Sequence, residues 1–107
     1  MTLDATHACV VDLDGVVWLA DEPLPGATEG LALLRSAEIP VLFATNNSAP
    51  THAELAAKLE RQGAEVRAGE IVTSSDAAAL LLAGTSRASV VGEAGLREAL
   101  ARAGIAI

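Results

Sequence analysis

The segment ACVVDLDG, residues 8–15, places two aspartates directly after a short apolar run. The apolar run predicts a buried strand, and residues two apart in an extended chain point to the same side. Asp12 and Asp14 should therefore project together from the carboxyl end of this strand, the edge where open α/β sheets bind ligands. An isolated Asp-x-Asp-Gly is more often a solvated turn. The apolar run before it, and a second polar turn after the next strand, favour a site.

Paired carboxylates at such an edge suit two kinds of chemistry. They offer hard oxygen ligands to a divalent cation that keeps positions open for water and a phosphate. They also suit catalysis in which one carboxylate attacks as a nucleophile and the other transfers a proton. Asp12 and Asp14 are therefore the first candidates for both catalytic and metal-binding roles.

Around this segment the chain alternates short β-branched runs with helical patterns. This order predicts an α/β fold, a Rossmann-like, largely parallel sheet with helices on both faces. Ser74 and Ser75 are expected to cap the third helix. The predicted strands lie at 8–11, 41–44, 71–73, 88–91 and 105–107, a loop or small hairpin at 15–26, and helices at 28–39, 50–62, 76–83 and 93–103.

A second polar turn, TNNS at residues 45–48, follows the predicted strand at 41–44. Its hydroxyl, backbone amides and carboxamides are uncharged donors that suit phosphate oxygens, and the next helix begins close by with its positive dipole end. Taken alone, the turn would be interpreted as a helix cap. It gains significance only together with the acids at the end of the first strand.

The composition restricts the partners. The chain has 107 residues, 51% of them hydrophobic, and 14 acidic against 7 basic residues give a net charge of −7. This charge argues against nucleic acid and against a polybasic membrane contact, because both need clustered Lys and Arg. The longest apolar run, residues 77–83, is shorter than the roughly 20 residues of a membrane helix. The single Cys9 cannot form an internal disulfide, which fits the cytoplasm.

Residues 12–18, DLDGVVW, resemble motif I of the haloacid dehalogenase superfamily, and residues 43–48, FATNNS, resemble its motif II. The order and spacing are similar to the branch that contains the nitrophenylphosphatases, the phosphoglycolate phosphatases and NagD. The resemblance covers nearly the whole chain and corresponds to the N-terminal portion of such a protein. Further matching segments are EPLPGA at 22–27, TSS at 73–75 and VGEAGL at 91–96.

By this resemblance the protein is a Mg²⁺-dependent phosphomonoester hydrolase acting on a small phosphorylated metabolite. Asp12 would be the nucleophile that takes the phosphoryl group as an aspartyl-phosphate, and Asp14 would protonate the leaving alcohol and then activate water. The Asp12 carboxylate and the Asp14 backbone carbonyl would hold Mg²⁺. Thr45, the Asn46 amide and nearby Asn47 would bind the phosphoryl oxygens. An acid at position 14 is typical of the phosphatases of this superfamily and not of its dehalogenases.

Two further parts of the family's site have no counterpart in this sequence. Lys58 is the only lysine, and it lies inside a predicted helix, where a solvated position is expected. The acidic pair that completes the magnesium shell in the family is also missing, since Asp21 and Asp76 are the only aspartates after Asp14 and neither belongs to a pair. The sequence therefore carries about half of the site that the resemblance implies.

The resemblance also implies a division of the chain. Residues 1–84 would form the N-terminal part of the catalytic core, and residues 85–107 would begin an inserted α/β cap, inside which the chain stops. We therefore expect an incomplete enzyme, with weak or no phosphatase activity from this chain alone.

Two alternatives to an active phosphatase stay open. The chain could be a non-catalytic, truncated remnant that retains the Mg²⁺- and phosphate-binding corner. A receiver-like phosphoacceptor domain also places an aspartate at a strand end, but it is disfavoured, because its acidic pair precedes the acceptor strand and it needs a later lysine that this sequence lacks. A homo-oligomer is also open, because exposed apolar strand edges favour self-association.

Three other side chains have competing interpretations. Trp18 could line a substrate entrance, but an anchor in a partly buried loop is at least as good an interpretation. His7 and His52 have no neighbouring Cys or His cluster, which argues against a zinc site. A solvent-facing position is expected for His52.

Overall fold

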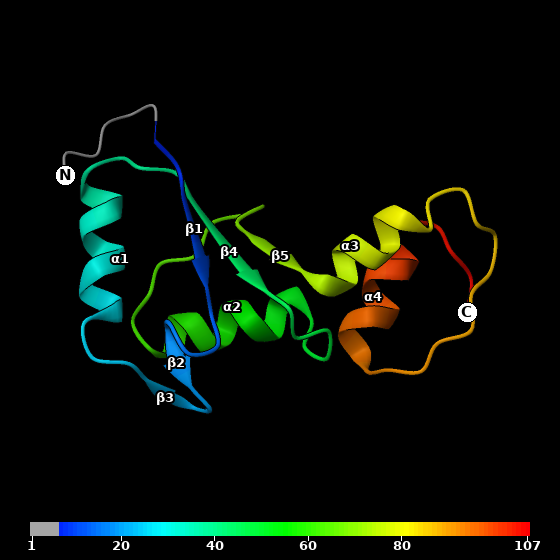
Figure 1. Cartoon of the computed structure of the whole chain (residues 1–107), viewed down its shortest axis with the longest axis horizontal. Helices are drawn as coiled ribbons and strands as arrows, with labels where there is room; N and C mark the ends of the chain where they lie inside the picture. The colour runs from blue at the N-terminus through cyan, green and yellow to red at the C-terminus, as the bar shows by residue number, and fades with distance from the viewer. Residues whose placement is uncertain (1–6) are drawn as a thin grey trace.

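A computed structural model describes residues 7–107 of the chain (Figure 1). Strands β1, β4 and β5 form a parallel sheet in that order, and the short strands β2 and β3 pair antiparallel. The predicted α/β class with a parallel sheet is confirmed. None of the helices within residues 7–107 has the length and apolar character of a membrane span. The elements are β1 Cys9–Asp12, β2 Trp18–Leu19, β3 Glu22–Pro23, α1 Ala27–Ser36, β4 Val41–Thr45, α2 His52–Arg61, β5 Ile71–Thr73, α3 Ser74–Leu81 and α4 Ala94–Arg102.

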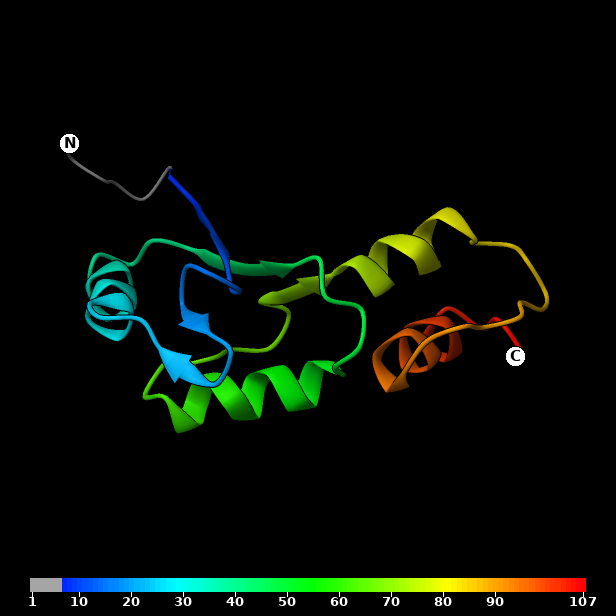
Figure 2. The same ribbon diagram turned by 60° about the horizontal axis from the view of Figure 1, so that its bottom comes forward.

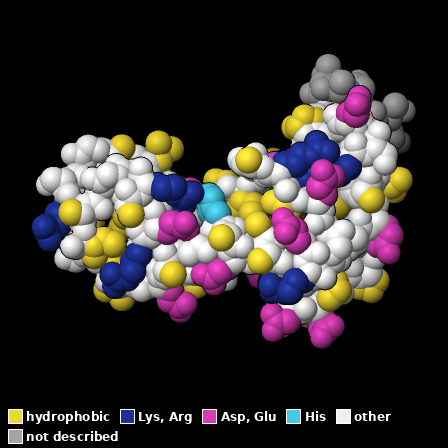
Figure 3. Space-filling view, turned by 180° about the vertical axis from the view of Figure 1, so that it is seen from behind, with side chains coloured by type: hydrophobic (Ala, Val, Ile, Leu, Met, Phe, Trp, Pro, Cys, Tyr) yellow, Lys and Arg dark blue, Asp and Glu magenta, His cyan; other side chains and the backbone are white. Residues whose placement is uncertain are grey.

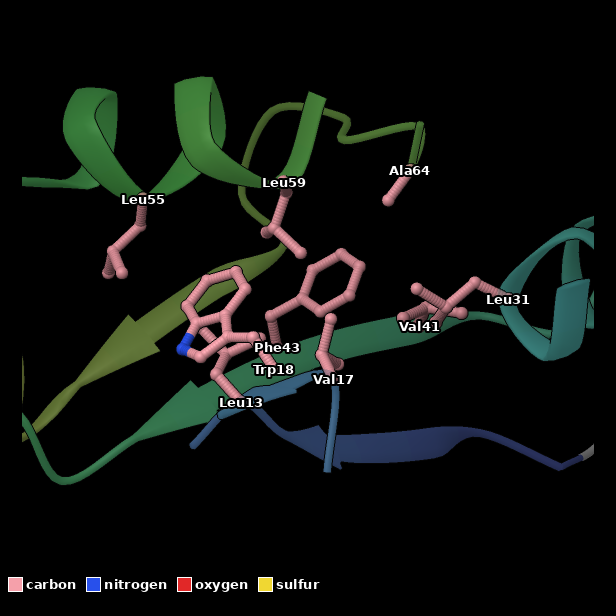
Figure 4. Packing of buried hydrophobic residues seen from close by; sticks show 9 residues of the cluster. All are labelled: Leu13, Val17, Trp18, Leu31, Val41, Phe43, Leu55, Leu59 and Ala64. Atoms are coloured by element: carbon pink, nitrogen blue, oxygen red, sulfur yellow. The ribbon is translucent and has the colours of Figure 1, made fainter. Parts of the chain in front are cut away.

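The main hydrophobic core lies between the sheet and helices α1 and α2 (Figure 4). In β4, Val41 and Phe43 are buried, whereas Leu42 between them is 36% exposed. This alternation is expected of a strand that has one covered face. Leu31 from α1 and Leu59 from α2 belong to the same buried cluster as Val41 and Phe43. The core therefore anchors the strand that carries the TNNS turn.

Helices α1 and α2 pack on the same face of the sheet, whereas helices on both faces are predicted from the sequence. The strand order is β1, β4, β5, so both crossover connections move across the sheet in the same direction. Because both crossovers are expected to be right-handed, both helices lie on the same face of the sheet. Val10 and Leu42, paired in register on the opposite face, are 66% and 36% exposed. The described helices leave this second face open.

The segment after β1 forms the predicted small hairpin. Gly15 has a φ of 83°, and its N–H donates to the Trp18 carbonyl at 2.7 Å. Position 15 thus needs the left-handed conformation that glycine adopts without a steric penalty. The tight turn brings Trp18 back over the core, where the residue is 2% exposed. The interpretation of Trp18 as a buried anchor is confirmed.

A smaller second lobe follows β5 and makes the molecule elongated (Figures 1 and 2). Helix α3 continues directly from β5, and α4 packs against it through a separate buried cluster of Ala79, Ala99, Leu100 and Ile105. The Cα radius of gyration is 15.3 Å, compared with about 13 Å for a compact domain of this size. The molecular surface narrows between the two lobes (Figure 3).

Three local predictions for the second lobe are wrong. The segments at 88–91 and 105–107 are not strands. The pairing near them is one isolated bridge between Arg87, just before the first segment, and Ala106, and Val91 is 100% exposed. A strand needs a ladder of hydrogen bonds to a neighbour, and one bridge does not supply it.

The cap of α3 is Thr73, whose hydroxyl accepts a hydrogen bond from the Asp76 N–H. The helix therefore begins at Ser74, directly after β5, and both serines predicted to cap it lie inside its first turn.

Candidate active site

The carboxyl ends of the parallel strands bring distant segments of the chain together at one edge of the sheet. Asp12, the last residue of β1, pairs in register with Ala44, and Thr45 at the end of β4 pairs with Thr73 of β5. Parallel strands all end at the same edge, which is where α/β sheets place their ligands. The predicted acids and the predicted polar turn are therefore neighbours in space.

Asp14 is held by hydrogen bonds to both of its carboxylate oxygens. Trp18 Nε1 donates to Oδ1 at 3.0 Å, and Thr45 Oγ1 donates to Oδ2 at 3.1 Å. Thr45 is buried, and its hydroxyl oxygen also accepts a hydrogen bond from the Asn47 N–H at 3.1 Å. The two sequence motifs thus form one connected structure, with Asp14 and Thr45 at the junction.

Asp12 is exposed, and its carboxylate has no hydrogen bond or ion pair from the described residues. It lines an open pocket of about 770 Å³ together with Asp14, Thr45 and Asn46. Asn47 lines a neighbouring pocket of about 430 Å³, which Asp14 also borders. The structure therefore places four of the five candidate residues around one pocket and the fifth beside it.

Two serines that the sequence suggested only as helix caps hold the TNNS turn in place. Ser74 Oγ donates to the Asn46 carbonyl at 2.9 Å, and Ser75 Oγ donates to the Ser48 carbonyl at 3.0 Å. Ser75 is almost completely buried. The position of both serines directly after a parallel strand is a signal that could have identified them, since that position lies at the ligand-binding edge.

Lys58 lies over the indole ring of Trp18, which corrects the expected solvated position. Its Nζ is 4.2 Å from the ring centroid, donates to the Ala20 carbonyl at 2.7 Å and lies 3.4 Å from a carboxylate oxygen of Asp21. A cation in this place is attracted to the electron-rich ring face. The ammonium group of Lys58 is therefore held by three residues of the hairpin segment: Trp18, Ala20 and Asp21.

His52 is also not solvent-facing as expected. Its Nε2 is 2.7 Å from Asp76 Oδ2, and Arg102 Nη1 lies 3.2 Å from its Nδ1. Burial raises the pKa of Asp76, but hydrogen bonds from the Thr73 backbone and from His52 outweigh it, so this pKa lies below its ordinary value. The cluster joins α2, α3 and α4 at the waist of the molecule, and no candidate site residue belongs to it.

The paired acids fit a magnesium ion in part. No group of three or more His, Cys, Asp or Glu residues within 7–107 is arranged to hold a metal ion. Magnesium needs few protein ligands, because it keeps several waters and often takes one or two carboxylates plus substrate phosphate oxygens. The free carboxylate of Asp12 beside Asp14 is compatible with such an ion.

Known proteins match this chain over almost its whole length. The family model of haloacid dehalogenase-like hydrolases matches residues 9–106. The acid sugar phosphatase of Staphylococcus saprophyticus is 36% identical over 94% of this chain and 40% of its own length.

Two solved structures share the fold. NagD from E. coli K-12 has a TM-score of 0.84 and 30% identity, with coverage of 98% of this chain and 42% of NagD. The glycerol phosphate phosphatase from Mycobacterium tuberculosis, in complex with magnesium, has a TM-score of 0.82 and 34% identity, with coverage of 94% and 32%. The chain therefore spans about two fifths or less of the length of the proteins it matches.

Proposed function

This chain belongs to the haloacid dehalogenase-like hydrolase family, and we propose that the pocket lined by Asp12, Asp14 and Thr45 is a phosphatase site. The observation that carries the proposal is the hydrogen bond between Asp14 and Thr45, which joins the paired acids to the polar turn. The names of two similar proteins, an acid sugar phosphatase and a glycerol phosphate phosphatase, support a small phosphorylated metabolite as the substrate class.

Asp12 acts as the nucleophile in this proposal. Its unpaired carboxylate oxygen forms a bond to phosphorus while the bond from phosphorus to the leaving oxygen breaks. Asp14 gives its proton to that leaving oxygen. Asp14 then takes a proton from the water that attacks the aspartyl-phosphate, which releases phosphate and restores Asp12.

In this proposal the TNNS turn binds the phosphoryl oxygens through the Asn46 amide, Asn47 and the Thr45 hydroxyl. The single proton of that hydroxyl donates to Asp14 in the structure and would turn to a phosphoryl oxygen when Asp14 carries its own proton. These donors are uncharged, so their orientation decides how well they bind an anion. Ser74 and Ser75 support this role, because they hold two carbonyl groups of the turn from the side of α3.

Magnesium is the proposed cofactor, with Asp12 and Asp14 as the residues that would hold it. When bound there, the ion would reduce the repulsion between the anionic Asp12 and an anionic phosphate. The magnesium named with the structure of the glycerol phosphate phosphatase supports this choice.

A second candidate function is binding of Mg²⁺ and phosphate without turnover. Phosphoryl transfer uses cations to neutralise the charge that develops on the phosphate. Within residues 7–107 there is no cluster of three metal ligands, and Lys58, the only lysine of the sequence, is paired with Trp18 and Asp21. The pairing of Lys58 leaves its charge engaged away from the pocket, which favours binding without turnover as the second candidate.

Three further assignments belong to the proposal. Residues 1–84 are assigned to the catalytic core and residues 85–107 to the beginning of a cap. The absence of helices and strands over 85–93 is compatible with this boundary, although α3 of the assigned core packs on α4. The cytoplasm is the proposed location, supported by a single free thiol at Cys9. Open sheet edges and the exposed Val10 support a homo-oligomer as a further proposal.

Beryllofluoride, which mimics a phosphoryl group on an aspartate, tests the site independently of turnover. We expect a Mg²⁺-dependent bound fluorine signal by NMR in the wild-type chain. The signal should be lost in Asp12→Asn and kept in Glu29→Gln, an exposed position on α1. A signal that survives in Asp12→Asn would show that the nucleophile is wrong, and the absence of a signal in the wild type would refute both candidate functions.

Hydrolysis of p-nitrophenyl phosphate then separates the two candidates. Turnover that disappears in Asp12→Asn supports the phosphatase. An adduct without turnover supports the binding function.

A further inference from the structure

We infer that Trp18 is a positioning residue for Asp14: its indole N–H holds Oδ1, which fixes the rotamer of the carboxyl so that Oδ2 lies beside Thr45. The inference deepens the proposed function and rests on the catalytic role that it gives to Asp14. The observation behind it is that the two oxygens of this carboxyl have different kinds of partner, at 3.0 and 3.1 Å.

The indole of Trp18 can act only as a donor, since its Nε1–H has no accepting lone pair. The residue is 2% exposed, so packing in the core fixes the position of the indole. The backbone of the hairpin also restrains it, because the Gly15 N–H donates to the Trp18 carbonyl and the Trp18 N–H donates to the Leu13 carbonyl at 3.3 Å. The indole N–H of Trp18 is therefore fixed in place as a donor to Oδ1 of Asp14.

The hydroxyl of Thr45 differs because it can either donate or accept. In the structure it donates to Oδ2 and accepts from the Asn47 N–H. The hairpin therefore holds one oxygen of the Asp14 carboxyl, and the TNNS turn holds the other. Thr45 also lines the pocket that contains Asp12. The Asp14 carboxyl is thereby oriented toward the side where the phosphoryl group is proposed to bind.

Lys58 supports Trp18 from the face of the ring. Its Nζ lies 4.2 Å from the ring centroid and is itself held by the Ala20 carbonyl and Asp21. A cation over the ring withdraws electron density from it and strengthens the N–H as a donor. The indole thus transmits the charge of Lys58 to Asp14, although these two residues form no hydrogen bond or ion pair with each other.

A spectroscopic test is direct, because Trp18 is the only tryptophan of the sequence and gives one indole N–H signal in an NMR spectrum. We expect slow hydrogen exchange of this signal, a clear change of its chemical shift in Asp14→Ala, and a smaller change in Lys58→Met that Lys58→Arg reverses. Three-bond couplings of Asp14 should report one χ1 rotamer in the wild type and rotamer averaging in Trp18→Phe.

Glu54→Gln is the matched control, because Glu54 lines the same pocket as Trp18 and Asp14 without a hydrogen bond to either. It should leave the indole signal and the Asp14 couplings unchanged. An indole signal that does not respond to Asp14→Ala, or a single Asp14 rotamer in a folded Trp18→Phe, would overturn the inference. If Trp18→Phe does not fold, the Asp14→Ala and Lys58 variants decide the question. Failure of the beryllofluoride adduct would refute the phosphatase site while leaving these measurements interpretable.

Discussion

Arg35 and Glu70 face each other through two parallel hydrogen bonds, Nη1 to Oε2 at 2.5 Å and Nη2 to Oε1 at 2.6 Å. Arg35 lies in the last turn of α1 and Glu70 directly precedes β5, and their side chains are 10% and 14% exposed. This hydrogen-bonded contact is the main reason that the pKa of Arg35 is raised and the pKa of Glu70 is lowered. The pair therefore ties the first crossover helix to the third strand of the sheet.

We expect Glu70→Gln to lower the free energy of unfolding by about 1–3 kcal/mol, because it leaves a largely buried guanidinium without its charged partner. Urea denaturation measures the change. Arg67→Gln is the control, since Arg67 and Glu65 form an exposed pair, 60% and 57% exposed, and such pairs contribute about 0–1 kcal/mol. Equal effects of the two substitutions would contradict the prediction.

Acid should destabilise the fold in a defined pH window. The pKa of Glu70 lies below its ordinary value of 4.5, and that of Asp76 lies below 3.8. A carboxyl whose pKa is lowered by folding contributes its full stability above the unfolded pKa and loses it as the pH falls through the folded pKa. We expect the free energy of unfolding to decrease as the pH falls below 4.5. This decrease should be smaller in Glu70→Gln, and an unchanged slope in that variant would show that Glu70 does not contribute.

Gly95 is required for the close approach of α4 to the TNNS turn. Its N–H donates to the Ala49 carbonyl at 2.9 Å, and a Cβ there would lie 2.1 Å from the Pro50 carbonyl oxygen and 2.6 Å from that of Ser48. We expect Gly95→Ala to destabilise the protein by about 1–3 kcal/mol, as overpacking does. Gly30→Ala in α1 meets nothing within 4 Å and should stabilise by about 0.5–1 kcal/mol. Thermal unfolding compares the two, and a neutral Gly95→Ala would contradict the packing described.

His52 connects α2 to the second lobe through Asp76 and Arg102. We expect His52→Ala to accelerate amide hydrogen exchange in α3 and α4, because it removes a hydrogen-bonded link at the narrow waist, and to leave the parallel sheet protected. Glu60→Gln, an exposed position on the same helix, should change neither region. Unchanged protection in α4 of His52→Ala would mean that the α3–α4 cluster holds the second lobe by itself.

The elements near the site could be predicted because their causes are local. The apolar run before Asp12, the prolines at positions 23 and 25 and the helical spacing after Pro50 each restrict the backbone directly. The failed strands at 88–91 and 105–107 have the same apolar signal. They lack a neighbouring strand with which to form a ladder of hydrogen bonds. The periodicity of one segment contains no information on whether such a neighbour exists.

The contacts of charged side chains were less predictable. Lys58 was expected in solvent and lies on Trp18, and His52 was expected in solvent and pairs with Asp76. A charge in a helix has many possible partners, and the choice depends on which distant element packs beside it. Sequence spacing does not encode that choice.

The sequence by itself determined the α/β class, the two polar strand ends and the acids that follow the first strand, because backbone periodicity and turn chemistry act over a few residues. Only the tertiary structure decided that Thr45 and Trp18 share the carboxyl of Asp14, that Ser74 and Ser75 hold the turn, and that both crossover helices lie on one face. These features depend on strand order and on packing between segments tens of residues apart, which are set by the free energy of the whole chain.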